Sequence, residues 1–239
     1  MAPVHSYSNW NKRRSDDVEQ VEPYQKFFFI CEGVNTETWY FKRLVDLQKQ
    51  LGFHSRIDIR LLEKTDRDRD ISYPKRLISF ADDQKKDPEI EFDKEHDRMI
   101  IVFDADIFES KVKNYTEILE TAKENGDILA ITNPSFELFL LLHYDGSYES
   151  SILPHIDEIL RNEKEGNQTY IYKLLLEKSG MNSKKNSRIG ELAQYIDIAI
   201  KQEKNLNQDI TRCSGQVTCN IGKVIDDIRN ISITQNAVQ

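Results

Sequence analysis

Short apolar runs alternate with helically spaced apolar positions along the first part of the chain. The run KFFFIC at 26–31 has no polar break, which is typical of a strand buried on both faces. Tyr40, Leu44 and Leu47 then recur at helical spacing. The same patterns predict strands at 26–31, 55–63, 98–106 and 127–132, and helices at 36–51, 74–88, 111–126 and 134–143.

This order of strands and helices predicts the fold class. Strands that alternate with crossover helices form a mostly parallel four-stranded sheet flanked by helices, an α/β fold, over residues 25–146. Thr36 is the expected N-cap of the first helix. Amphipathic segments after Gly146 predict a C-terminal helical region, or annex, at 147–239, and residues 1–24 are expected to be a flexible arm.

The composition indicates a soluble, globular protein. Of the 239 residues 38% are hydrophobic and 31% are charged, and no apolar run approaches the ~18–20 residues that a membrane span needs. The arginines near the N-terminus precede no apolar stretch, so no signal peptide is predicted. Cys31, Cys213 and Cys219 lack the spacing of a metal or disulfide framework and are expected to be buried hydrophobes. These features predict a cytoplasmic protein.

The net charge of −8 restricts the possible partners. Non-specific coating of nucleic acid depends on phosphate neutralisation by Lys and Arg, so an acidic chain is unsuited to it. A local basic groove remains compatible with this charge. Lys173, Lys184, Lys185 and Arg188 are opposed by few acids and are candidates for contact with a phosphate backbone, although a solvated helix face explains them equally well.

Acidic residues follow two of the predicted buried strands. Glu32 comes after the first strand, and Asp104 and Asp106 come at the end of the third. Functional groups gather at the carboxyl ends of parallel strands, and residues two apart in an extended segment point to the same side. If the two strands are neighbours, three carboxylates meet there and repel one another unless a cation is present. Hard oxygen ligands suit Mg²⁺ or Mn²⁺.

Structural explanations exist for each acid taken alone. An Asp at a strand end also caps the following helix, and Glu37 also favours a helix N-terminus. Glu137 lies in an apolar helix, where it is costly unless paired, metal-bound or hydrogen-bonded to neighbouring backbone. His143 at the end of that helix either acts in the site or only interacts with the helix dipole.

Three motifs resemble the RloB-like proteins, which are found among restriction and phage-defence loci. The motifs are CEGVNTETWYF at 31–41, VFDAD at 102–106 and TNPSFELFLLLHY at 132–144, with a weaker echo in KKNSRIGELAQYIDIAIK at 184–201. The EG and DAD elements are also similar to the two-part signature of the Toprim fold. Val34 and Asn35 depart from that pattern, because Lys-like residues are more usual there.

The resemblance implies roles for residues in the matching positions. Glu32 would be a metal ligand or general acid/base, and Asp104 and Asp106 would bind Mg²⁺ or Mn²⁺. Glu37, Asn133 and Glu137 would line the same cleft, where Asn133 is a candidate contact for nucleic acid.

Two functions follow as hypotheses. The first is a metal-dependent nuclease of RNA, with tRNA as one candidate, or of DNA. The second is a non-catalytic metal- or nucleotide-binding sensor or partner subunit in a defence complex. The chain has no GxxxxGK[ST] motif, so energy coupling would need an ATPase or other defence-system partner, and a homo-oligomer is also compatible with the sequence. A primase-like nucleotidyl transferase is less favoured, because no zinc-binding or separate basic region accompanies the core.

Overall fold

The centre of the molecule is a parallel sheet of the four strands that the sequence predicts. The computed structural model describes residues 5–7, 24–64, 73–105 and 114–231. The sheet has the order β1-β3-β2-β4-β5-β8. Its parallel strands are β2 (Gln25–Cys31), β3 (Ile57–Glu63), β4 (Arg98–Asp104) and β5 (Ile128–Asn133). The predicted α/β class is therefore confirmed.

Two short strands extend this sheet antiparallel at its edges. β1 (His5–Tyr7) pairs with β3, and β8 (Thr218–Cys219) pairs with β5. β1 falls in the segment expected to be a flexible arm, and β8 falls in the segment expected to be helical. Both strands are too short to show a period of two in the sequence, which is why the pattern did not predict them.

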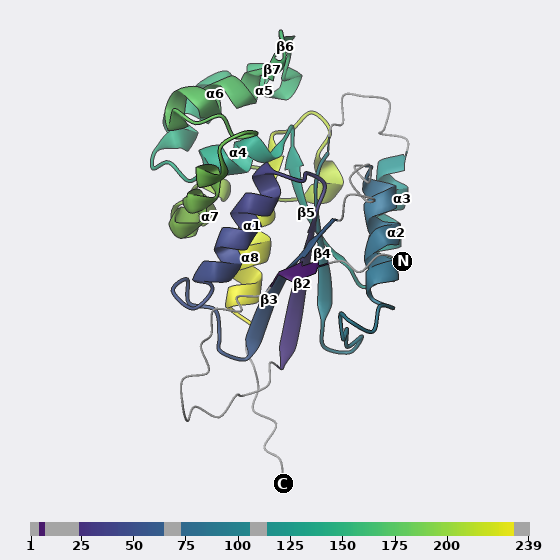
Figure 1. Cartoon of the computed structure of the whole chain (residues 1–239). Coiled ribbons are helices and arrows are strands. Elements are labelled where there is room, and N and C mark those ends of the chain that lie inside the picture. The colour runs from purple at the N-terminus through teal and green to yellow at the C-terminus, as the bar shows by residue number, and fades with distance from the viewer. Residues whose placement is uncertain (1–4, 8–23, 65–72, 106–113, 232–239) are drawn as a thin grey trace.

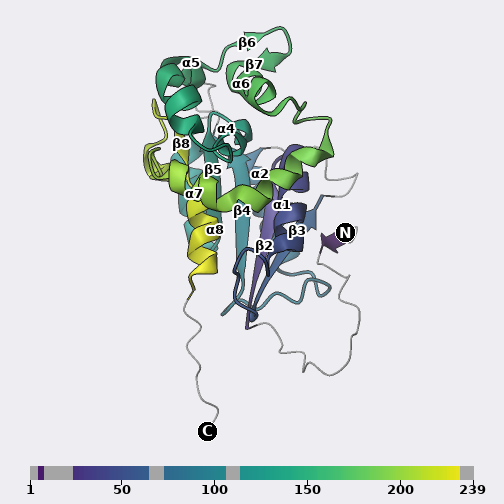
Figure 2. The same ribbon diagram turned by 90° about the vertical axis from the view of Figure 1, so that its left-hand side faces the viewer.

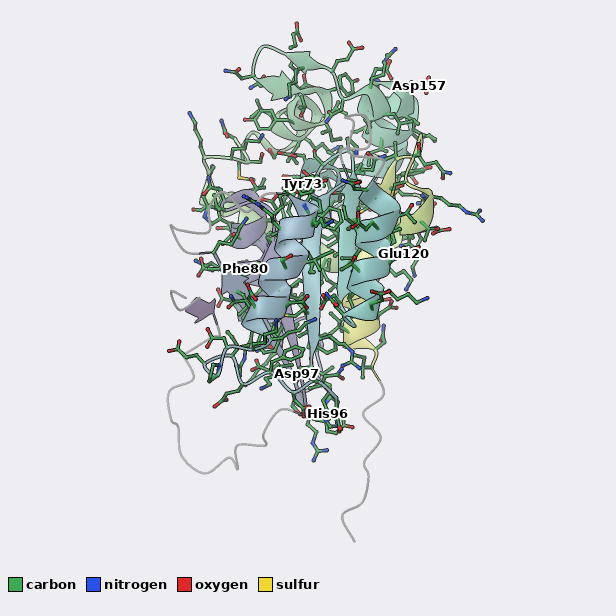
Figure 3. The ribbon with its side chains drawn as sticks, turned by 90° about the vertical axis from the view of Figure 1, so that its right-hand side faces the viewer. Tyr73, Phe80, His96, Asp97, Glu120 and Asp157 are labelled. Atoms are coloured by element: carbon green, nitrogen blue, oxygen red, sulfur yellow. The ribbon has the colours of Figure 1, made fainter. Side chains whose placement is uncertain are left out.

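Helices cover both faces of the sheet, as the alternating pattern predicts. α1 (Thr36–Leu47) and α8 (Ile221–Arg229) lie on one face, and α2 (Pro74–Gln84) and α3 (Tyr115–Glu124) lie on the other (Figures 1–3). A hydrophobic core lies on each face of the sheet, and successive residues of β2 point into the two cores alternately. Phe27 and Phe29 join the cluster under α1, whereas Phe28 and Ile30 join the cluster under α2 and α3. This alternation explains the unbroken aromatic run.

Most of the chain after β5 packs on the α1 face, whereas Cys213 joins the core on the other face. α4 (Phe136–Leu141) is followed by a π-helical turn and a 3-10 turn, and then by α5 (Ile156–Arg161). Figure 1 shows α5, α6 and a small hairpin beyond one end of the central strands. The remaining elements are β6 (Lys164–Glu165), β7 (Gln168–Thr169), α6 (Tyr170–Ser179), η4 (Ser187–Tyr195), α7 (Ile196–Glu203) and η5 (Ile210–Arg212).

Several helices differ from the predicted ones. α1 ends at Leu47 and α2 at Gln84, earlier than the glycine and proline positions suggested. Thr36 is not the N-cap of α1. It is the first helical residue, and its hydroxyl donates to the Ser183 carbonyl at 3.0 Å, which ties a distant segment to the start of the helix.

The three cysteines are free and buried, as expected. Within the described ranges no helix is long and apolar enough to cross a membrane.

Candidate functional site

Glu32 and Asp104 meet at the carboxyl edge of the sheet. β2 and β4 are parallel neighbours, with Cys31 opposite Val102, so the two strands end side by side. The Asp104 backbone N–H donates to Glu32 Oε2 at 3.2 Å. The predicted meeting of these acids depended on the two strands being neighbours, and the pairing of β2 with β4 meets this condition. Asp106, the other predicted ligand, lies outside the described residues.

Asp104 lies among other acids. The buried Thr132 hydroxyl donates to Asp104 Oδ1 at 2.7 Å from the neighbouring strand. Burial raises the pKa of the Asp104 carboxyl well above its usual value, and the charges of Glu37, Glu32 and Glu137 raise this pKa further. The three glutamates therefore lie close enough for their charges to act on Asp104. Such repulsion is relieved by protonation or by a bound cation.

Glu37 reaches this group from the first turn of α1. Its carboxylate lies directly over Gly33, because a Cβ atom added at Gly33 would be 2.1 Å from Glu37 Oε2. Because Gly33 has no Cβ, it leaves the space that this carboxylate occupies. Burial raises the pKa of Glu37 to about 6. Glu137 adds to the rise, whereas Lys64 and Lys184 oppose it.

Glu137 is held by two serine hydroxyls. It lies in the first turn of α4 and is 7% exposed. The Ser135 hydroxyl donates to Oε2 at 2.7 Å, and the Ser183 hydroxyl donates to Oε1 at 3.4 Å. These bonds offset the cost of burying the acid in an apolar helix. Ser183 comes from the C-terminal region, so that region helps to close the site, which local sequence patterns do not reveal.

Asn133 also anchors the C-terminal region. Its side chain is fully buried, and its amide nitrogen donates to the Cys213 and Gln216 carbonyls at 3.0 and 2.8 Å. These contacts are structural. Its expected contact with nucleic acid stays a prediction, and the buried amide leaves little surface for it.

The predicted basic residues do not form one cluster of shared contacts. The Lys184 ammonium lies 5.8 Å from the centre of the Tyr172 ring, and its charge acts on Glu37. Lys173 pairs with Glu165 of the hairpin. Arg188 Nε lies 3.8 Å from Glu191 Oε1, and Lys185 is exposed. Lys184 is thus the predicted cation whose charge reaches the acids.

His143 belongs to the core. Its Nδ1–H donates to the Phe139 carbonyl at 2.9 Å, so Nε2 accepts from the Tyr40 hydroxyl at 2.9 Å. Burial lowers the pKa of His143 to about 4. The imidazole is therefore neutral at physiological pH and serves the packing of α1 against α4.

The acids fit a hard divalent cation by their chemistry. Carboxylate oxygens are the ligands that Mg²⁺ and Mn²⁺ prefer, and the repulsion around Asp104 favours a cation. Within the part of the chain that the structure describes, no three His, Cys, Asp or Glu side chains are grouped as metal ligands. A ligand set of Glu32, Asp104 and Asp106 thus includes a residue beyond that part.

The fold and the site define an α/β protein with neighbouring acids at the carboxyl edge of a parallel sheet. A family model described as RloB-like protein matches residues 27–228, and the chain belongs to the RloB-like family. This match covers the parallel sheet and most of the C-terminal region. No curated protein and no solved structure matches the chain.

Proposed function

We propose that this protein is a metal-dependent nuclease of a phage-defence type. Its substrate would be RNA, with tRNA as a candidate, or DNA. The observation that carries the proposal is the proximity of Glu32 and Asp104 at one sheet edge, with Glu37 and Glu137 within reach of Asp104. Membership of the RloB-like family supports it.

The residues would divide the work as follows. Glu32, Asp104 and Asp106 would hold the ion, and Glu37 and Glu137 would orient water and polar groups of the substrate. A bound Mg²⁺ or Mn²⁺ supplies Lewis-acid polarisation of a phosphate and activation of water. Lys184 would offset the negative charge of the acids. An ATPase or another defence protein remains an expected partner, and the cytoplasm remains the expected compartment.

Nuclease assays with isosteric variants test this proposal. The purified chain is incubated with labelled tRNA, single-stranded RNA and plasmid DNA in Mg²⁺ or Mn²⁺. We expect cleavage by the wild type and its loss in Glu32→Gln and Asp104→Asn. Glu163→Gln is the matched control, because this carboxylate is 82% exposed and lies in the C-terminal region. Cleavage that persists in both site variants would overturn the proposed site.

The second candidate is a non-catalytic metal- or nucleotide-binding sensor or partner subunit. The observation that favours it is that Asp104 and Glu37 are only partly exposed and have raised pKa values, because recessed acids offer a large substrate little room. This function predicts Mn²⁺ binding by calorimetry, loss of that binding in Asp104→Asn, and no cleavage of any of the three substrates. Metal-dependent cleavage by the wild type would exclude it.

A further inference from the structure

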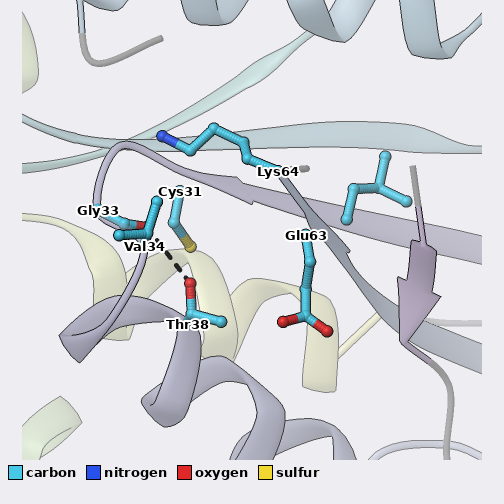
Figure 4. Close-up of a pocket in the computed structure, with 7 residues that line it drawn as sticks. Cys31, Gly33, Val34, Thr38, Glu63 and Lys64 are labelled. Carbon is cyan, nitrogen blue, oxygen red and sulfur yellow. Dashed lines mark hydrogen bonds between the residues drawn. The ribbon is translucent and has the colours of Figure 1, made fainter. Parts of the chain in front are cut away.

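A small hollow opens at the carboxyl edge of the sheet, lined by the residues directly before and after Glu32 but not by Glu32 itself. It lies between the end of β3 and the turn that joins β2 to α1 (Figure 4). Its volume of about 30 Å³ is room for one or two water-sized groups. The residues that line it are Cys31, Gly33, Val34, Thr38, Leu62, Glu63 and Lys64.

The turn on one side of this hollow carries no positive charge. Its residues are Gly33, Val34 and Asn35, and the Val34 side chain is exposed. Thr38 uses its hydroxyl to donate to the Gly33 carbonyl at 3.3 Å, which fixes the turn against α1. A phosphate that approached the carboxylates would therefore need a cation from another element.

The opposite side of the hollow supplies one. Pairs along β2 and β3 are 32 residues apart, as in Phe29 with Leu61, and the same offset places Lys64 beside Glu32. The Lys64 ammonium donates to the Glu32 backbone carbonyl. Figure 4 shows the Lys64 side chain extended across the end of β2 toward the turn.

Alternation along β3 separates Lys64 from the acid that precedes it. Glu63 points to the other side of the strand in Figure 4, and its carboxylate pairs with Lys42 at 2.7 Å. The charge of Lys64 also acts on groups around the site. Burial is the largest cause of the raised pKa of the Glu37 carboxyl and of the Cys31 thiol. The positive charge of Lys64 lowers both pKa values and so partly offsets this rise.

We propose that Lys64 is the phosphate contact of this site, and that its ammonium holds a non-bridging oxygen of the substrate phosphate at the hollow. This inference rests on the proposed nuclease function and names a residue that the sequence motifs do not contain. A lysine ammonium is a compact charge that suits a single phosphate oxygen, and the hollow has room for water-sized groups only. Lys64, which directly follows β3, thus provides the cation that the turn after β2 lacks.

Binding measurements on the full chain test the contact. Lys64→Met keeps most of the aliphatic stem and removes the charge, and Lys64→Arg keeps the charge. Lys86→Met is the matched control, because this side chain is 72% exposed and follows the far end of α2. The probe is fluorescently labelled single-stranded RNA, and DNA of the same sequence, with Ca²⁺ in place of Mg²⁺. Fluorescence anisotropy gives Kd over a range of salt concentrations.

We expect Lys64→Met to weaken binding about tenfold or more, because a hydrogen bond to a charged group is lost. The slope of log Kd against log salt should become shallower by about 0.7, the share of one phosphate contact on a single strand. Lys64→Arg should retain the wild-type slope, and Lys86→Met should match the wild type in affinity. A Lys64→Met variant with the wild-type slope would overturn the proposal, even if its affinity fell, because that result indicates a structural role.

Cleavage is measured in a separate assay, so that a failure of the nuclease proposal can be distinguished from a failure of the Lys64 proposal. If the wild type cleaves and Lys64→Met raises KM with little change in kcat, both proposals are supported. If the wild type cleaves no substrate, the nuclease function is overturned, while the salt slopes still decide whether Lys64 contacts phosphate. Equal melting temperatures of the variant and the wild type are the check that the variant folds.

Discussion

Asp97 and Asp104 show how the same residue type has different surroundings at the two ends of one strand. Asp97, just before β4, accepts from the Lys26 and Asp93 backbone N–H groups at 2.7 and 2.9 Å and lies 3.4 Å from the Lys26 ammonium. Figure 3 places it at the end of the sheet opposite Tyr73. Asp104, at the other end of β4, is surrounded by acids instead. Asp97 is explained by the fold, whereas Asp104 lacks comparable compensation among the described contacts, and this contrast indicates function.

Gly33→Ala should disturb the site through Glu37. The added Cβ would lie 2.1 Å from Glu37 Oε2, so the carboxylate must move. Misplacement of a catalytic group by about 1 Å can cost on the order of a hundredfold in rate. We therefore expect cleavage to fall by about that factor with the chain still folded, measured by single-turnover assays and circular dichroism. Val34→Ala, in the same turn, is the control, and unchanged cleavage by Gly33→Ala would show that Glu37 is dispensable.

His143 gives a pH dependence of stability with a definite sign. Its pKa is about 4 in the folded chain, below the ordinary value of 6.5, so the unfolded chain binds more protons. The contribution is present above pH 6.5 and is lost as the pH falls toward 4. Between pH 7 and pH 5 this one group should cost about 2 kcal/mol of unfolding free energy.

Urea denaturation of the wild type and of His143→Gln at both pH values measures this cost. The variant lacks the titrating group, so its stability should fall less between pH 7 and pH 5. His54→Gln serves as the control because His54 is exposed. A fall as large in His143→Gln as in the wild type would show that other groups set the acid sensitivity.

At the scale of elements, the start of α1 is joined to the C-terminal region. The Ser183 carbonyl accepts from Thr36, and the Lys184 carbonyl accepts from the Asn35 amide at 3.5 Å. The same segment then supplies the Ser183 hydroxyl to Glu137. The loop around Ser183 therefore connects Glu137 on α4 with the residues directly before Glu37 at the start of α1.

Gly190 on η4 sets how closely this segment approaches α1. An added Cβ would lie 2.4 Å from the Trp39 carbonyl oxygen, and backbone moves less readily than a side-chain tip. Gly190→Ala should therefore destabilise the chain by about 1–3 kcal/mol, as overpacking does. Chemical denaturation measures the loss, with Ser187→Ala on the exposed side of η4 as the control. A stability equal to that of the control would mean that the two elements can separate without cost.

Across the whole molecule, the features that could be predicted from the sequence were those with a repeating pattern of apolar and polar residues. Uninterrupted runs such as Phe27–Phe29 identified the strands, and the alternation with helices implied a parallel sheet. The sequence placed Glu32 and Asp104 together only on the condition that their strands are neighbours, which the pairing of β2 with β4 meets. Contacts between distant segments left no local signal. Lys64 lay next to a loop with alternating charges, and Ser183 lay in a polar joint, so neither could be assigned to the site.

Metal binding should appear as a stability effect on the whole chain. The acids around Asp104 repel one another, so a divalent ion that binds only the folded state should stabilise it and raise Tm. At an ion concentration of a hundred times Kd, the free energy of unfolding should rise by about 2.7 kcal/mol. Differential scanning fluorimetry with and without Mn²⁺ measures this shift.

Asp104→Asn makes the test two-sided. The amide keeps the shape and can still accept from Thr132, but it removes one negative charge from the cluster. Without metal the variant should therefore melt at a higher temperature than the wild type, and with Mn²⁺ its Tm should rise less. Glu163→Gln should behave as the wild type in both conditions, because an exposed charge contributes little to stability. An equal Mn²⁺ shift in Asp104→Asn would show that the ion binds elsewhere, because loss of the Asp104 charge would then leave metal binding unchanged.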